Sequence, residues 1–167
     1  MPEKQTLERA RRDRRAGKAA STQAGEFVRE EIHHVREGKH GARSAKQAIA
    51  IGLSKARRAG VKLPAPPQGA SRRTKQSAAS ASRAGAHGLR KASPRRSRAV
   101  RSALKQESRS TTSSRALSKQ ATSAARKRSP KSRSAAAKKA ARTKGPAVRH
   151  AAAQKAARTR RRHASSM

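Results

Sequence analysis

Bulky apolar side chains are scarce in the last 104 residues of this chain. Residues 64–167 contain no Phe, Tyr or Trp, and their large aliphatic side chains are Leu89, Val100, Leu104, Leu117 and Val148. So little apolar surface cannot offset the entropy that a chain loses when it becomes ordered. We therefore predict that residues 64–167 form a long, largely disordered, basic low-complexity tail, with weak helices near 97–128 and 135–163.

The acidic residues are concentrated at one end of the chain. Seven of the eight Asp and Glu residues lie in the first 37 residues, together with nine Lys and Arg, whereas the other 130 residues hold 36 Lys and Arg and a single acid, Glu107. Such a segment needs external counter-ions, and nucleic acid is the commonest dense polyanion in a cell. We therefore expect duplex DNA as the partner, with RNA as the alternative.

The most ordered part is expected at residues 21–63. The apolar residues of the first half, Ala24, Phe27, Val28, Ile32 and Val35, fall on one helical stripe. A second helical pattern follows, in which Ser44 and Gln47 have the spacing of a capping box. Gly52 interrupts this second helix at a cost of about 1 kcal/mol, so we predict a close approach of two helices there. The pattern predicts a helical hairpin.

A hairpin of this size is marginally stable by itself. Residues 1–20 have the composition of a basic N-terminal helix, and we expect the hairpin to depend on that helix, on nucleic acid or on a second copy, which would make a homo-oligomer through residues 21–63. The predicted fold class is small all-α: a helical hairpin, with or without a preceding helix, followed by a long, largely disordered basic tail.

Residues 21–64, STQAGEFVREEIHHVREGKHGARSAKQAIAIGLSKARRAGVKLP, resemble a family of short basic bacterial proteins that carry a domain of unknown function. The preceding PEKQTLERARRDRRAGK is similar to the start of the same family. This resemblance implies a bacterial source and an association with DNA, and it implies no activity or binding residues. The Ala/Lys/Arg-rich tail is similar in style to linker-histone tails and bacterial histone-like proteins, and SPRR at residues 93–96 matches an element of such tails.

Basic side chains of the tail and of the second hairpin helix are the expected contacts to nucleic acid. They are Arg95, Arg96, Arg98, Arg126, Lys127, Arg128, Lys138, Lys139, Arg142, Lys155, Arg158, Arg160, Arg161 and Arg162 in the tail, and Lys46, Arg57 and Arg58 in the hairpin. No aromatic side chains accompany them to stack on bases. We therefore expect phosphate neutralisation without sequence preference, and bridging or compaction of DNA, as in a nucleoid-associated, histone-like protein.

A nonapeptide occurs twice in the tail, as AAAKKAART at 135–143 and as AAAQKAART at 151–159. Ala, Lys and Arg favour helix, but like charges four residues apart repel each other. We predict that both copies are disordered alone and become helical on DNA.

Three further motifs leave alternatives open. SPRR can form a turn that enters a narrow minor groove, although a plain turn in a basic tail is the commoner structure. Residues 38–41, GKHG, have the form of a backbone clamp of RNA-binding domains, but helix-ending glycines explain the same letters and no strand pattern flanks them. The hairpin could also be a helix-turn-helix, although Arg43, Lys46 and Gln47 are poor candidates for base contacts.

Histidines and glutamates are spaced as in some metal sites. Glu30 precedes His33 by three residues, Glu31 precedes His34 by three, and His40 follows nearby. Neighbouring histidines are more often surface residues, and a di-metal site would need further carboxylates from other helices, of which the chain has few beyond Glu3, Glu8 and Asp13. No metal and no other cofactor is therefore expected.

No pattern of catalytic residues is present, so we expect the protein not to be an enzyme. There is no Cys. The first residues contain no apolar segment typical of a secretory signal, and no stretch reaches the roughly 20 apolar residues of a membrane span. We expect a cytoplasmic protein of the nucleoid, without a membrane partner. An RNA- or ribosome-associated basic protein is the alternative function.

Overall fold

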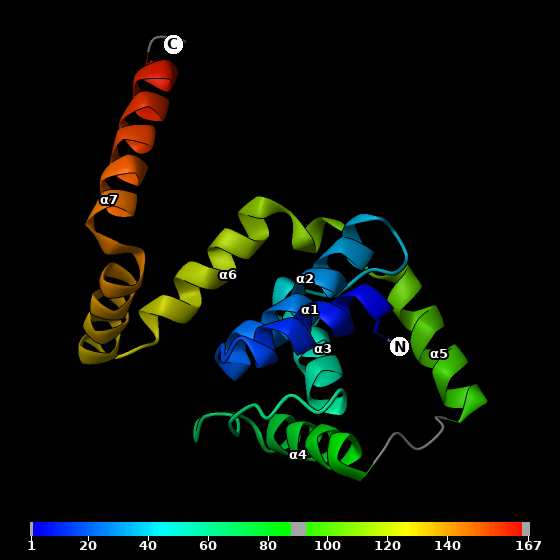
Figure 1. Ribbon diagram of the computed structural model, residues 1–167. Helices are drawn as coiled ribbons and strands as arrows, with labels where there is room; N and C mark the ends of the chain where they lie inside the picture. The colour runs from blue at the N-terminus through cyan, green and yellow to red at the C-terminus, as the bar shows by residue number, and fades with distance from the viewer. Residues whose placement is uncertain (1, 88–92, 165–167) are drawn as a thin grey trace. The chain divides into compact units, whose positions relative to one another are not determined.

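A computed structural model describes residues 2–87 and 93–164, and all regular structure in these two ranges is helical (Figure 1). The elements are α1 (Lys4–Arg15), α2 (Ala20–Arg36), α3 (Ala45–Arg58), α4 (Arg72–His87), α5 (Pro94–Gln106), the 3-10 turn η1 (Ser110–Thr112), α6 (Ser114–Arg126) and α7 (Pro130–Ala164). The chain divides into two compact units, residues 1–120 and 121–167. Among the described helices, none is both long enough and apolar enough to cross a membrane.

α2 and α3 pack against each other in antiparallel fashion, and Gly52 is where they come closest. A Cβ atom on Gly52 would lie 2.7 Å from Cα of Val28 and 3.0 Å from the carbonyl oxygen of Phe27. The predicted close approach at Gly52 is thereby confirmed. At the N-terminus of α3, Ser44 Oγ accepts a hydrogen bond from the Gln47 backbone N–H at 3.2 Å, as expected of the cap, and Gln47 Oε1 accepts one from the N–H of Arg43 at 2.7 Å.

The core of the first unit is small and contains one large side chain. Phe27 is 1% exposed and packs with Ala10, Ala24 and Ala56, while Leu7, Leu53, Val61 and Leu63 cover this cluster from outside. Because Ala10 belongs to α1, the first helix completes the hairpin. Val35, Ala42 and Ala48 form a second cluster near the α2–α3 loop.

α4 packs against the C-terminal end of α3 (Figure 1). Gly85 of α4 contacts the carbonyl oxygen of Arg57 so closely that no Cβ atom would fit, and Ala81 is 3% exposed. The Arg57 guanidinium donates hydrogen bonds to the carbonyl oxygens of Leu63 at 3.1 Å and Pro64 at 2.6 Å, and to Ser82 Oγ at 3.3 Å. Arg57 thus joins α3, the proline-containing connection and α4.

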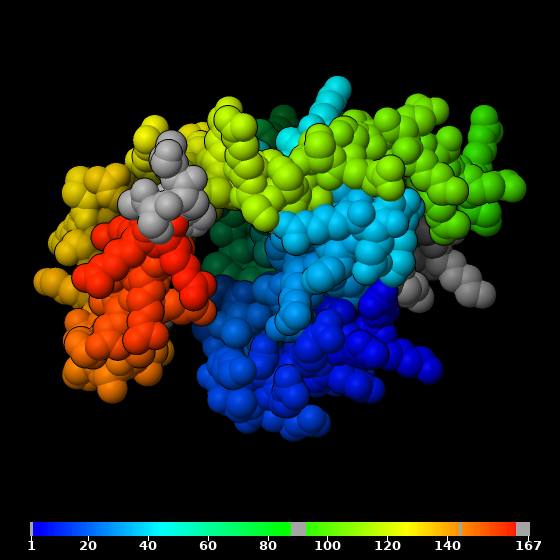
Figure 2. All heavy atoms as spheres, turned by 90° about the horizontal axis from the view of Figure 1, so that it is seen from above, coloured from blue at the N-terminus to red at the C-terminus, as the bar shows by residue number. Residues whose placement is uncertain are grey.

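The segment between α5 and α6 packs on the α2–α3 loop. Gly41 N–H donates to the carbonyl of Leu104 at 2.7 Å, Ala42 N–H donates to Ser108 at 3.1 Å, and Arg36 Nε donates to Thr112 at 3.0 Å. Figure 2 shows this segment, in yellow-green, covering the light-blue end of α2. Residues 104–112 therefore belong to the folded N-terminal unit.

The prediction of a long, largely disordered tail is wrong. Helices α4 to α7 occupy most of the described residues from 72 to 164, so the protein is an all-helical protein and not a small hairpin with a disordered tail. Two physical effects explain the difference. Ala, Arg, Lys and Gln form helices through local hydrogen bonds that need no apolar core. In addition, α4 makes its contacts through Ala and Gly. These residues allow close packing, but they are not counted among the bulky apolar residues from which order was predicted.

Two glycine substitutions should have opposite effects on the stability of α2 and α3. Gly52→Ala would force the two helix backbones apart and should destabilise the N-terminal unit by about 1–3 kcal/mol. Gly25→Ala, in α2, has open space around the added methyl group and should stabilise by about 0.5–1 kcal/mol. Hydrogen exchange of the α3 amides, followed by mass spectrometry, measures both changes. A change of the same sign for both variants would contradict the packing described here.

Candidate nucleic-acid interface

Six of the seven carboxylates in the first 37 residues form ion pairs within the N-terminal part of the protein. Arg9 Nε lies 2.7 Å from Glu26 Oε2, and Lys18 Nζ lies 2.7 Å from Asp13 Oδ1. The remaining ion pairs gather around Glu3, Glu30, Glu31 and Glu37. Glu8 is exposed and is the one acid of the seven without an ion pair among the described residues.

A buried polar cluster joins α1, α2 and α3. Lys55 Nζ lies 2.7 Å from Glu31 Oε2 and 3.0 Å from Glu30 Oε1, and the Glu3 N–H donates to Glu30 Oε2 at 3.0 Å. Burial acts to raise the pKa of Glu30, but the hydrogen bonds from Glu3 and Lys55 outweigh it and lower that pKa. Burial acts to lower the pKa of Lys55, but Glu31 and Glu30 outweigh it and raise that pKa. Glu30 and Lys55 are therefore held in their charged forms.

The Glu3 side chain belongs to the rim of the same cluster. His34 Nε2 lies 2.8 Å from Glu3 Oε1, and Lys39 Nζ lies 3.2 Å from the same oxygen. These two hydrogen bonds lower the pKa of Glu3 to about 2. Glu3 thus carries a full negative charge, and it ties the start of α1 to the end of α2.

The described basic residues between positions 56 and 160 have no comparable partners. Among residues 56–87 and 93–160, no Lys or Arg side chain forms an ion pair with a described carboxylate. The charge asymmetry of the sequence therefore persists in three dimensions. Most acids of the N-terminal helices are ion-paired, whereas the described basic side chains between residues 56 and 160 have no carboxylate partner.

α5 begins at the SPRR element. Ser93 is the N-cap residue, and Pro94 occupies the first turn, where its missing N–H costs nothing. SPRR therefore starts a helix and does not form a free turn. Arg95, Arg96 and Arg98 are exposed, and Arg98 shares one helix face with the exposed Arg101 and Lys105.

α7 contains both nonapeptides, and both are helical. Gly145, with a φ of 68°, and Pro146 interrupt the helix between the two copies, so that each copy lies in its own straight segment. The predicted disorder of the free repeats is therefore wrong. Both copies keep a Lys–Arg pair at i and i+3, Lys139 with Arg142 and Lys155 with Arg158, and all four side chains are exposed.

Nothing in α7 is buried among its described side chains. A helix without an apolar face is not stabilised by packing against another helix. Like charges such as Lys138 and Arg142, four residues apart, destabilise it further. A polyanion lying along α7 would remove this repulsion.

The other predicted contact residues divide into two groups. Arg126, Lys127, Arg128, Lys138, Arg160, Arg161 and Arg162 are exposed, as are Lys46 and Arg58 of α3. Arg57 is only partly exposed, and its guanidinium binds the carbonyls of the 63–64 segment. That role depends on a loop that meets α3 only in the folded protein, and no sequence pattern marks it.

The structure does not support the helix-turn-helix and RNA-clamp hypotheses. α3 lies between α2 and α4, so it is a central helix and does not project for insertion into a groove. In the GKHG loop, Gly41 donates its N–H to Leu104, and His40 lies 3.3 Å from Glu31. The backbone of this loop is therefore engaged within the protein.

Comparison with known proteins bears on the N-terminal helices. No curated protein and no solved structure shows significant similarity to this chain. Residues 3–66, which include α1, α2 and α3 and end before α4, match the model of a family of unknown function (DUF6496).

Proposed function

We propose that the protein binds duplex DNA without sequence preference, through the exposed basic faces of α5, α6 and α7, and that it acts in the bacterial nucleoid. The observation that carries this proposal is the separation of charge within the structure. Six of the seven N-terminal acids form ion pairs with nearby basic groups, whereas the exposed cations beyond Lys55 have no described carboxylate partner up to Arg160. Each Lys or Arg that meets a phosphate releases condensed counter-ions, which is the main driving force of such binding.

The lack of sequence preference follows from the side chains available. Phosphate contacts position a protein on DNA but carry no base information. The exposed faces of α5 and α7 present mainly Lys, Arg, Ala and Ser, they contain no Phe, Tyr or Trp for stacking, and Gln106 and Gln154 are their only amide side chains. Phosphate contacts are therefore expected to dominate.

Bridging of DNA is a further part of the proposal. α5 belongs to the first unit and α7 to the second, and each presents its own basic side chains. Two linked binding elements gain from a high effective concentration once one of them is bound. Two duplex segments can thus be held by one chain.

Binding of full-length protein to three unrelated 30-base-pair duplexes tests this function. Fluorescence anisotropy between 50 and 200 mM salt should give similar affinities for all three duplexes. The slope of log K against log salt concentration should be about −5 or steeper, because each phosphate contact contributes about −0.9. A slope near zero would contradict the proposal.

Two competitors decide the class of ligand. A structured RNA of equal phosphate number should compete no better than the duplex. A strong preference for that RNA would replace the DNA proposal by the RNA alternative. Polyglutamate of equal charge should compete poorly, since its charge density is lower, and equal competition would show that the protein is a general polyanion binder.

A further inference from the structure

The Glu31 carboxylate occupies a core position of α2. It lies on the same helix stripe as Phe27 and Val35, which are four residues away on either side, and it is 0% exposed. Within the described protein, the contacts of its two oxygens are ion-pair contacts. Its neighbours are Lys55 Nζ, 2.7 Å from Oε2, and His40 Nε2, 3.3 Å from Oε1.

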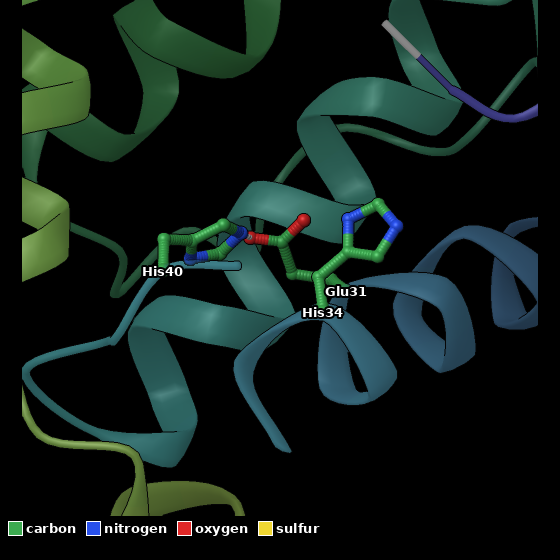
Figure 3. Close-up of side chains that lie close together, drawn as sticks. All are labelled: Glu31, His34 and His40. Atoms are coloured by element: carbon green, nitrogen blue, oxygen red, sulfur yellow. Dashed lines mark ion pairs between the residues drawn. The ribbon is translucent and has the colours of Figure 1, made fainter. Parts of the chain in front are cut away.

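Two imidazoles face this carboxylate, and they come from different segments. His34 lies one turn further along α2, and His40 lies in the loop after α2, as Figure 3 shows. The side chains of His34 and His40 are 13% and 16% exposed. One ligand atom of each residue, Glu31, His34 and His40, lies within 4.8 Å of the others.

The second nitrogen of each imidazole is held by an acceptor. His34 Nε2 lies 2.8 Å from Glu3 Oε1, and His40 Nδ1 lies 2.9 Å from the carbonyl oxygen of Gly41. When these nitrogens donate, the opposite nitrogens present lone pairs, and in Figure 3 it is these nitrogens that point toward Glu31. Metal-binding histidines typically have this arrangement, in which a carboxylate or a backbone carbonyl orients the ring.

The buried carboxylates also outnumber the ammonium groups beside them. Two buried carboxylates, Glu30 and Glu31, share one ammonium group, that of Lys55. A buried carboxylate such as that of Glu31 requires nearby positive charge. A divalent cation between Glu31 Oε1 and the two imidazoles would supply it.

We propose that Glu31, His34 and His40 form a zinc-binding site. One carboxylate and two imidazoles are a donor set that Zn²⁺ prefers, whereas Ca²⁺ and Mg²⁺ prefer oxygen ligands alone. Zinc bonds of about 2.0–2.1 Å require these side chains to move slightly closer together than they are here. We expect His40 to make most of this movement, because it belongs to a loop and not to a helix.

The expected role of the ion is structural. The three side chains are largely buried, and the site joins the end of α2 to the loop on which residues 104–112 pack. Bound zinc would therefore hold the 37–44 loop in place for that contact. This inference is independent of DNA binding.

Calorimetric titration of untagged, metal-free, full-length protein with Zn²⁺, in a phosphate-free buffer and without nucleic acid, tests the site. We expect one ion per chain with a Kd of about 1 µM or tighter. His34→Gln and His40→Gln should each weaken binding at least about tenfold. His33→Gln is the matched control, because His33 is adjacent but exposed, and it should leave the affinity unchanged.

Two further measurements separate ligand loss from misfolding. Circular dichroism should show that His40→Gln keeps the helical content, since His40 lies outside the helices. X-ray absorption of the zinc-loaded protein should show nitrogen and oxygen donors at about 2.0–2.1 Å. The proposal is overturned if no saturable binding is found, or if His33→Gln weakens binding as much as His40→Gln does.

Discussion

Replacing six cations of α7 by Gln should weaken binding to duplex DNA by about 100-fold or more at 0.1 M salt. The six residues are Lys138, Lys139, Arg142, Lys155, Arg158 and Arg160. One phosphate contact is worth roughly a factor of eight at this salt concentration, so the loss of only two or three simultaneous contacts suffices. Gln is a good helix former, and its introduction removes like-charge repulsion, so α7 should remain helical. Fluorescence anisotropy at several salt concentrations should also show a shallower slope.

The matched control replaces six exposed cations of the N-terminal helices. These are Lys4, Arg11, Arg12, Arg14, Arg15 and Arg29, all exposed on α1 or α2. The net charge changes by the same amount, but the residues lie among the acids of the first 37. We expect a much smaller loss of affinity. An equal loss in both variants would show that net charge alone governs binding, and it would contradict the role given to α7.

A second control tests whether charge or residue type matters. Lys138, Lys139 and Lys155 replaced by Arg keep every charge, and binding should be retained. Circular dichroism of all variants is needed beside the binding data. Loss of helix in the Gln variant would mean that the decrease in affinity reports folding of α7 and not phosphate contact.

The hairpin could be predicted from sequence because its signals are local. Ser44 and Gln47 are close in the chain, and the capping role of Ser44 depends only on the first turn of α3. Gly52 was informative because glycine is costly within a helix unless another backbone approaches it. The cap and the glycine within a helix can both be recognised from nearby residues in the sequence, without knowledge of the whole fold.

The order of the later residues could not be predicted from the amount of apolar surface. The packing of α4 on α3 relies on Gly85 and Ala81, which allow close backbone contact but resemble tail residues in composition. Helix α7 needs no core, since its Ala-rich segments are held by local hydrogen bonds. A prediction of disorder that rests on apolar burial alone leaves out the high helix propensity of Ala, Lys and Arg.

The candidate interface was partly visible in the sequence. Exposed cations such as Arg98 and Arg158 can be recognised because a charge on the surface needs no tertiary partner. Arg57 could not be distinguished from Arg58, because its carbonyl partners at 63–64 are brought to it by the fold. Glu31 gives a signal that the apolar pattern by itself does not: a carboxylate in the middle of an apolar helix stripe indicates a buried polar site.

Phe27→Ala should have the largest effect on the stability of the first unit. Phe27 is the one large side chain at the centre of the α1–α2–α3 core, and it is 1% exposed. Removal of a buried Phe costs about 3–5 kcal/mol, because a cavity remains where the ring was. That is a large part of the stability of a small domain. Hydrogen exchange of the α2 amides should become faster by about 100-fold or more, since 1.4 kcal/mol corresponds to a factor of ten.

Val100→Ala serves as the control, because Val100 is 54% exposed on α5 and its truncation should change stability by no more than about 0.5 kcal/mol. Binding to duplex DNA should largely survive Phe27→Ala, since the described side chains of α7 include none that is buried in a core. The two readouts therefore separate the two units. If Phe27→Ala abolished DNA binding while the helical content of α7 remained, α7 would not be sufficient for binding, and the folded first unit, through α5 or through residues 1–63, would have to supply the main contacts to DNA.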